Sequence, residues 1–128
     1  MGLFNILNAE VACNQCLHSY TDRIQFKYSA TWQYEYALGD ELRWEDPRIN
    51  AGIRRPGEVL VYGMSELDGC PRCGFQNITS YQATHTYFED SVEYDIIVID
   101  NILHSIRTLQ DYNVYLEEDA HGNLGFPV

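Results

Sequence analysis

The chain has 128 residues and a formal net charge of −11, and 45% of its residues are hydrophobic. This is the length of one domain, and the hydrophobic content is too high for a disordered chain. No apolar run approaches the ~20 residues of a membrane span, the first residues lack the features of a secretory signal, and the acidic balance disfavours nucleic acid. We expect one cytoplasmic domain over residues 1–128 that binds neither membranes nor nucleic acid.

The N-terminal third is predicted to form strands. Residues 2–8 are apolar enough for an edge strand or a single helical turn, and residues 23–28 alternate with the period of a half-buried strand. Residues 31–38 alternate in the same way. This alternation predicts a continuous strand whose core face carries Trp32, Tyr34, Tyr36 and Leu38.

A loop and further strands follow. Residues 45–58 contain proline and glycine with few apolar side chains, which is the composition of a loop. Residues 59–62 and 75–88 are rich in strand-forming side chains. Residues 94–99 are the most hydrophobic strand candidate, which we expect at the centre of the sheet, and residues 114–126 have the pattern of a closing hairpin.

Asp100 and Asn101 allow two interpretations. Both tolerate positive φ, so they can form a two-residue hairpin turn with a returning strand in residues 102–109. Alternatively they cap a helix in residues 102–112, where apolar residues recur at helical spacing. We favour the hairpin because β-branched residues run directly into the turn. The expected fold is mainly β, with an antiparallel sheet and at most one or two short helices.

All four cysteines occur in two C-x-x-C pairs, at residues 13–16 and 70–73. Each pair can place two thiolates on one side of a tight turn, and two such turns complete the sulfur tetrahedron of a structural Zn²⁺. Gly74 after the second pair can adopt positive φ, whereas Leu17 takes its place after the first. Disulfides or another metal such as iron are the alternatives, and a reducing compartment favours a metal. We predict one structural zinc ion bound by Cys13, Cys16, Cys70 and Cys73.

The two cysteine pairs divide the chain into unequal parts. They flank a strand-rich insert, residues 17–69, and an acidic, strand-rich part follows at residues 75–128. Residues 89–128 contain nine acidic residues and one basic residue, so this segment carries −8 of the total charge of −11. The charge of the chain is therefore concentrated in its second half.

The cysteine motifs resemble those of a zinc ribbon of the rubredoxin-like kind. The resemblance rests on Cys13-x-x-Cys16 and on Cys70-Pro71-Arg72-Cys73-Gly74, and it implies a two-knuckle Cys₄ site joined to a sheet. More loosely, residues 24–44, with Gln-Tyr-Glu-Tyr and Leu-Gly-Asp, are similar to small uncharacterised bacterial proteins that carry such a ribbon. Some proteins of this size, acidity and all-β character are immunity proteins against interbacterial toxins, and by analogy the resemblance implies that function.

The expected function is binding and not catalysis. A closed four-sulfur site has no open position for a substrate, and no other motif supplies a catalytic constellation. Acidic residues of the second half are interleaved with tyrosines, and such a surface attracts and anchors a basic partner. We expect an acidic, zinc-stabilised protein that neutralises a basic protein, foremost a cognate bacterial toxin. A zinc-ribbon subunit of a larger assembly and a thiol-based metal or redox sensor are the alternatives. The predicted partner surface comprises Tyr87, Glu89, Asp90, Glu93, Tyr94, Asp95, Tyr112, Tyr115, Glu117, Glu118 and Asp119.

Overall fold

The computed structural model describes residues 4–45, 48–52, 54–67, 69–76 and 92–110. Within these ranges the chain forms eight strands and no helix, so the prediction of a mainly β fold is confirmed. In the same ranges no helix has the length and apolarity needed to cross a membrane. The strands predicted in residues 75–88 and 114–126 lie almost wholly outside the described residues.

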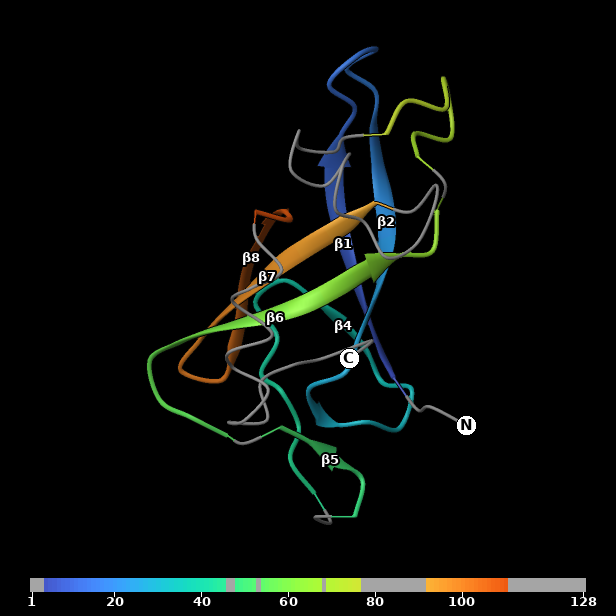
Figure 1. The fold of residues 1–128 in the computed structure, drawn as a ribbon. Coiled ribbons are helices and arrows are strands. Elements are labelled where there is room, and N and C mark those ends of the chain that lie inside the picture. Colours follow the sequence, from blue (N-terminus) through green and yellow to red (C-terminus); the bar gives the residue numbers. More distant parts are fainter. Residues whose placement is uncertain (1–3, 46–47, 53, 68, 77–91, 111–128) are drawn as a thin grey trace.

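Six strands form one sheet in the order β4-β1-β2-β6-β7-β8 (Figure 1). All neighbours in this sheet are antiparallel except β1 and β4, which are parallel. A second sheet pairs two short strands at the opposite end of the molecule from the cysteines (Figure 1). The strands are β1 (Asn5–Ala12), β2 (Ser19–Phe26), β3 (Ser29–Ala30), β4 (Glu35–Ala37), β5 (Asn50–Ala51), β6 (Glu58–Ser65), β7 (Glu93–Ile99) and β8 (Ile102–Thr108).

Strands β1 and β2 form a long hairpin that extends beyond the rest of the sheet. Eight residue pairs join them, from Asn5↔Phe26 at the base to Ala12↔Ser19 at the tip. Buried and exposed residues alternate along β2, because one of its faces packs on the core. Strand β6 pairs with β2 only from Ile24 to Phe26, and Glu66 N then donates to Arg23 O over 2.8 Å. Beyond this point no described strand pairs with the β2 side of the hairpin. This outer part carries the first cysteine pair.

The turn between β7 and β8 confirms the predicted hairpin. Asp100 and Asn101 have φ values of 48° and 69°, the left-handed conformation that a two-residue hairpin turn of this type requires. Residues 102–108 return as β8, so the helix alternative is wrong for this segment. Strand β7 is not central in the sheet as expected, because β8 alone separates it from the edge.

Hydrogen bonds between the two sheet edges close the curled sheet. The segment after β4 pairs with β8: Gly39 N donates to Leu103 O over 2.7 Å, and Leu103 N donates to Asp40 O over 2.9 Å. Leu42 N donates to Asn101 O over 2.9 Å at the next position. The sheet thereby wraps around a core whose fully buried members include Leu7, Ile24, Phe26, Val61, Ile96 and Leu103.

Two expectations for the first third of the chain are wrong. Residues 2–8 do not form an edge, because β1 lies between β2 and β4. Residues 31–38 do not form one continuous strand: Gln33 has a φ of 57°, which breaks the extended run, and only Glu35–Ala37 form β4. As a result Tyr36 is buried and Tyr34 packs at the core margin, while Trp32 and Leu38 are 59% and 40% exposed.

Candidate metal centre

The first cysteine pair forms the turn at the tip of the β1–β2 hairpin. Cys13 N donates to His18 O over 2.9 Å, and Leu17 N donates back to Cys13 O over 3.0 Å. These two bonds close a tight loop directly beyond the last strand pair. Leu17 adopts a φ of 63° at the position where a glycine is usual, and its side chain is 79% exposed.

The second cysteine pair repeats the same turn after β6. Cys70 N donates to Phe75 O over 2.9 Å, and Gly74 N donates to Cys70 O over 2.7 Å. Gly74 has a φ of 79°, so it occupies the position that Leu17 occupies in the first turn. Gly69, which precedes the pair, has a φ of 127°, and a Cβ there would lie 2.8 Å from Gly74 O. The second turn is therefore built on glycines at both ends.

The two turns face each other and bring all four sulfur atoms together at one end of the molecule. Their Sγ atoms lie within 4.8 Å of one another. The Sγ atoms of Cys13 and Cys73 are 3.6 Å apart, and those of Cys16 and Cys70 are 3.7 Å apart. A tetrahedron of thiolates at ~2.3 Å from a zinc ion has edges of about 3.8 Å, whereas a disulfide bond is about 2.05 Å long. All four cysteines are free, so the disulfide alternative is wrong in this structure, and the cluster can hold a metal ion.

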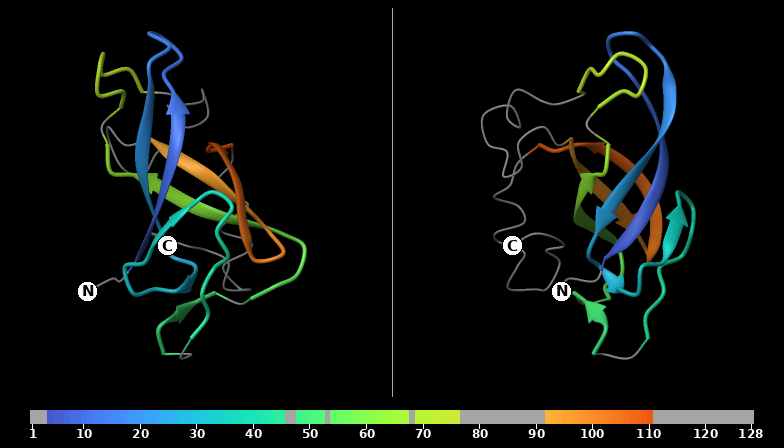
Figure 2. Two further views of the ribbon diagram at one scale, coloured as in Figure 1. Left: turned by 180° about the vertical axis from the view of Figure 1, so that it is seen from behind. Right: turned by 90° about the vertical axis from the view of Figure 1, so that its right-hand side faces the viewer.

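Figure 2 shows this arrangement from two further sides, with the hairpin tip and the segment after β6 next to each other. Cys13 and Cys70 are buried, Cys16 is half-buried and Cys73 is exposed. Tyr20 packs against Cys13 and Cys70 on the inner side of the cluster. The site is therefore a clasp between two chain segments, with one buried cysteine and one more exposed cysteine from each.

Backbone N–H groups aim at the sulfur atoms. The N–H groups of Gln15 and Cys16 lie 3.4 Å from Cys13 Sγ, and that of Arg72 lies 3.4 Å from Cys70 Sγ. Burial raises the pKa of the Cys13 thiol. The N–H groups of Gln15 and Cys16 and the neighbouring sulfurs outweigh this effect and lower the pKa to about 6. The pKa of Cys70 is lowered in the same way.

The pKa of the Cys73 thiol shifts in the opposite direction. The N–H of Phe75 lowers the pKa of its thiol, but burial and the three neighbouring sulfurs outweigh this and raise the pKa to about 12. These shifts favour negative charge on the two buried sulfurs and oppose it on Cys73, which keeps its proton until a cation compensates the charge. This is the electrostatic balance expected of a site that exchanges protons for a metal ion.

Three residues of the predicted partner surface are buried, which corrects that prediction. Glu93, Tyr94 and Asp95 are 0%, 3% and 1% exposed. They lie on β7, where both faces of the strand are covered along these residues. The other predicted partner residues lie outside the described ranges: Tyr87, Glu89, Asp90, Tyr112, Tyr115, Glu117, Glu118 and Asp119.

The buried β7 residues bind other side chains of the protein. Tyr62 donates its hydroxyl to Glu93, and Tyr94 donates to Asp22 Oδ2 over 2.7 Å. Arg107 pairs with Asp95 over 2.9 Å. Burial raises the pKa of Asp22, although hydrogen bonds from Ser65 and Tyr94 oppose the rise. These acids are thus part of the structure and are not available to a partner.

The burial of these acidic residues leaves the described surface with a different charge balance from that of the whole chain. All eight basic residues of the chain lie in the described ranges, together with eleven of its nineteen acidic residues. Three of those eleven, Asp22, Glu93 and Asp95, are buried, so the described surface carries equal numbers of acidic and basic residues. The acidic excess belongs to the remaining segments, chiefly residues 77–91 and 111–128.

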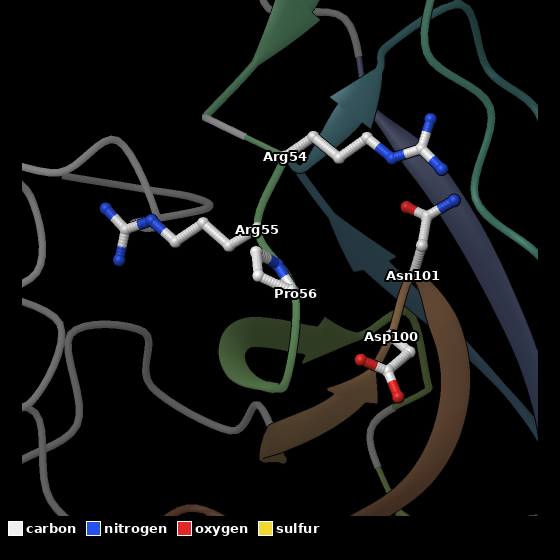
Figure 3. Close-up of a pocket in the computed structure, with 5 residues that line it drawn as sticks. All are labelled: Arg54, Arg55, Pro56, Asp100 and Asn101. Carbon is white, nitrogen blue, oxygen red and sulfur yellow. The ribbon is translucent and has the colours of Figure 1, made fainter.

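Sequence reasoning missed a concavity of about 400 Å³ beside the β7–β8 turn, lined by Arg54, Arg55, Pro56, Asp100 and Asn101 (Figure 3). Figure 3 shows Arg54 pointing towards Asn101 and Arg55 pointing the opposite way. Asp100 accepts the N–H of Gly57 over 2.8 Å, and Asn101 binds Trp44 Nε1 over 2.6 Å and Leu42 O over 3.0 Å. The carboxylate of Asp100 and the amide of Asn101 are therefore engaged in holding the surrounding loops.

Comparisons of the chain with protein-family models, with curated proteins and with solved structures found no match. No family is assigned on that basis. Of the predicted resemblance to a zinc ribbon, the structure supports the four-cysteine cluster that can bind a metal ion.

Proposed function

We propose that this chain is a non-enzymatic binding protein whose scaffold is held by one zinc ion on Cys13, Cys16, Cys70 and Cys73. The observation that carries the proposal is the equivalence of the two cysteine turns. Sulfur–sulfur distances of 3.6 and 3.7 Å between the turns match the edges of a zinc–thiolate tetrahedron. Sulfur fills all four positions around such an ion, so its role is structural.

The position of the cluster in the fold supports a structural role. Strands β2 and β6 share only three residue pairs, and the hairpin tip projects beyond them. The metal would tie this tip to the segment after β6, which the main sheet does not do. Removing the metal should therefore loosen this end of the molecule before the closed core.

We further propose a basic protein as the partner, in the first place a cognate bacterial toxin. Support comes from the net charge of −11 and from residues 77–91 and 111–128, which together hold six acidic residues and neither lysine nor arginine. Such segments attract a basic surface over a Debye length and accelerate association. An accessory subunit of a larger assembly and a thiol-based sensor are the alternative functions.

The decisive experiment co-expresses the chain with the product of the neighbouring gene. Rescue from toxicity by this chain supports the proposal, whereas a harmless neighbour contradicts the toxin partner. Binding rates then locate the surface: reversal of Glu117, Glu118 and Asp119 to lysine should slow association and flatten its salt dependence. The matched control reverses three exposed acids elsewhere, Glu10, Glu41 and Glu58, and should leave the rate nearly unchanged. A functional response to mild oxidant, with loss of zinc but retention of the fold, would instead indicate a sensor.

A further inference from the structure

Asp22 is a buried acid that forms no ion pair with a basic side chain of the described residues. It is 1% exposed and belongs to β2, the strand that begins directly after the first cysteine turn. The ion pairs of the described ranges involve other acids. A buried carboxylate without a cation is costly, and such a group commonly keeps its proton instead. The hydrogen bonds around Asp22 indicate which form fits the fold.

The hydroxyl of Ser65, the last residue of β6, is close to three hydrogen-bonding groups. Its Oγ lies 2.7 Å from Asp22 Oδ1 and 3.0 Å from Leu67 O. It also accepts the N–H of Leu67 over 2.9 Å. Ser65 is buried like Asp22, so these contacts are made away from solvent. A hydroxyl has one proton and two lone pairs, so Ser65 can donate to only one of the two oxygens.

A neutral Asp22 satisfies all of these contacts, whereas an ionised Asp22 does not. With the proton on Asp22 Oδ1, the acid donates to Ser65 Oγ, and Ser65 donates onward to Leu67 O. The other oxygen, Oδ2, then accepts the hydroxyl of Tyr94 over 2.7 Å. An ionised Asp22 would instead accept the proton of Ser65, and Leu67 O would lose this donor. The hydrogen-bond geometry therefore favours the neutral acid.

The charges around Asp22 act in the same direction as its burial. Titratable or charged residues from several elements interact with it, while the residue paired with it on β1 is the apolar Ala9: Tyr20 and Arg23 on β2, Tyr94 on β7 and Glu66 just after β6. Burial raises the pKa of Asp22, and the negative charge of Glu66 also raises it. Hydrogen bonds from Ser65, Tyr94 and the backbone N–H of Arg23 oppose the rise. The Arg23 guanidinium itself pairs with Glu66 over 3.0 Å.

Asp22 and Ser65 connect the two chain segments that carry the cysteine turns. Asp22 belongs to the strand that follows the first turn, and Ser65 ends the strand that precedes the second turn. Leu67, whose backbone N–H and carbonyl both contact the Ser65 hydroxyl, packs against the apolar cluster that contains Cys13 and Cys70. The proton between Asp22 and Ser65 therefore acts on a residue that lies three positions before a predicted metal ligand.

We propose that Asp22 is a positioning residue of the metal centre, which as a neutral acid donates to Ser65 and through it fixes Leu67 and the second cysteine turn. When Asp22 ionises, its proton goes to water and the Ser65 hydroxyl turns towards the carboxylate. Leu67 O then loses its donor, and the turn is held less firmly for the metal. The inference rests on the proposed metal site and adds to it a residue outside the four ligands.

Carbon-13 NMR of the full chain reads the charge of Asp22 directly. The side-chain carboxyl resonance of Asp22 is assigned by its loss in Asp22→Asn. In the protein with one equivalent of zinc it should have the chemical shift of a neutral acid at about pH 5, where exposed aspartates are mostly ionised. The pH titration of this resonance then gives its midpoint. The shift of an ionised carboxylate at about pH 5 would overturn the proposal.

Zinc affinity, measured on either side of that midpoint, tests whether the proton matters for the metal. Asp22→Asn donates to Ser65 at every pH, so it should match the wild type below the midpoint. Above the midpoint it should bind zinc about three- to tenfold more tightly, which is the effect of one hydrogen bond. Protonation of the cysteines affects both proteins and cancels in the ratio of their affinities. The matched control, Glu93→Gln, makes another buried acid neutral and should equal the wild type at both pH values. A ratio for Asp22→Asn that stays constant across the midpoint would refute the coupling.

Replacement of Ser65 tests whether Asp22 acts through its hydroxyl. Ser65→Ala should lower the zinc affinity by a similar factor, and adding Asp22→Asn should then change nothing, because the chain of hydrogen bonds is already broken. A gain from Asp22→Asn that persists in the Ser65→Ala background would assign the effect to charge alone and overturn the positioning role. A wild-type chain that binds no zinc would contradict the proposed function, whereas the carboxyl resonance of the metal-free protein still decides the form of Asp22.

Discussion

Loss of the metal clasp is expected to lower the free energy of unfolding by about 4 kcal/mol or more. The sulfur atoms of Cys16 and Cys70, which approach to 3.7 Å, belong to residues 54 positions apart. A cross-link that closes a loop of this length lowers the conformational entropy of the unfolded chain. This stabilises the folded state by about 4 kcal/mol at 25 °C. That is a large part of the ~5–15 kcal/mol by which domains are stable. For a chain of this size it corresponds to a fall in Tm of roughly 12–20 °C.

Calorimetry on the wild type and Cys70→Ser, each under reducing conditions with one equivalent of zinc or with excess chelator, measures this contribution. The wild type with zinc should unfold at the highest temperature, and the other three samples should unfold together, because the variant and the chelator remove the same interaction. This comparison separates the metal from the packing of the Cys70 side chain. Equal Tm values, within about 2 °C, for the wild type and variant in zinc would refute the reasoning.

Three further predictions concern the core, the thiols and the buried acid. Gly63→Ala should cost about 1–3 kcal/mol in urea unfolding, because the new Cβ would lie 2.6 Å from Ile24 Cγ2; wild-type stability would contradict this. Zinc affinity should fall about tenfold or more from pH 8 to pH 7, because Cys73, with a pKa of about 12, must release its proton when the metal binds. Competition with a chromophoric chelator measures this affinity, and an affinity independent of pH would exclude the proton release. Burial raises the pKa of Asp22 above its usual 3.8, so its contribution to stability is full below that value and is lost as pH rises through the folded pKa. Asp22→Asn should remove this part of the pH dependence, and an unchanged profile of unfolding free energy against pH would refute the assignment.

Features encoded by neighbouring residues could be predicted from the sequence. The spacing within each C-x-x-C pair determines the turn, and Gly74 provides the positive φ that the turn needs. The hairpin at Asp100 and Asn101 follows from β-branched residues that lead into two residues tolerant of positive φ. Both predictions depend on a few consecutive residues, and the structure confirms both.

Features that depend on distant residues could not be predicted. The alternation through Trp32 predicted a continuous strand, but Gln33 adopts a left-handed conformation, and the N–H of the next residue, Tyr34, donates to the distant Asn5. Charged residues are usually exposed, so Glu93 and Asp95 were natural candidates for a surface. Their burial depends on partners from other strands, Tyr62 and Arg107, which no local pattern identifies.

The position of the clasp has a consequence for the order of folding. The β1–β2 hairpin joins residues close in sequence and forms rapidly, whereas the bond from Ser65 to Asp22 joins residues 43 apart. The first cysteine turn precedes β2 and the second follows β6, so the antiparallel pairing of these strands brings the two turns towards each other. An ion already held by Cys13 and Cys16 can capture the second turn and shorten this slow search. Zinc would then accelerate folding as well as stabilise the folded state, and the refolding rate should rise with zinc until one equivalent is bound.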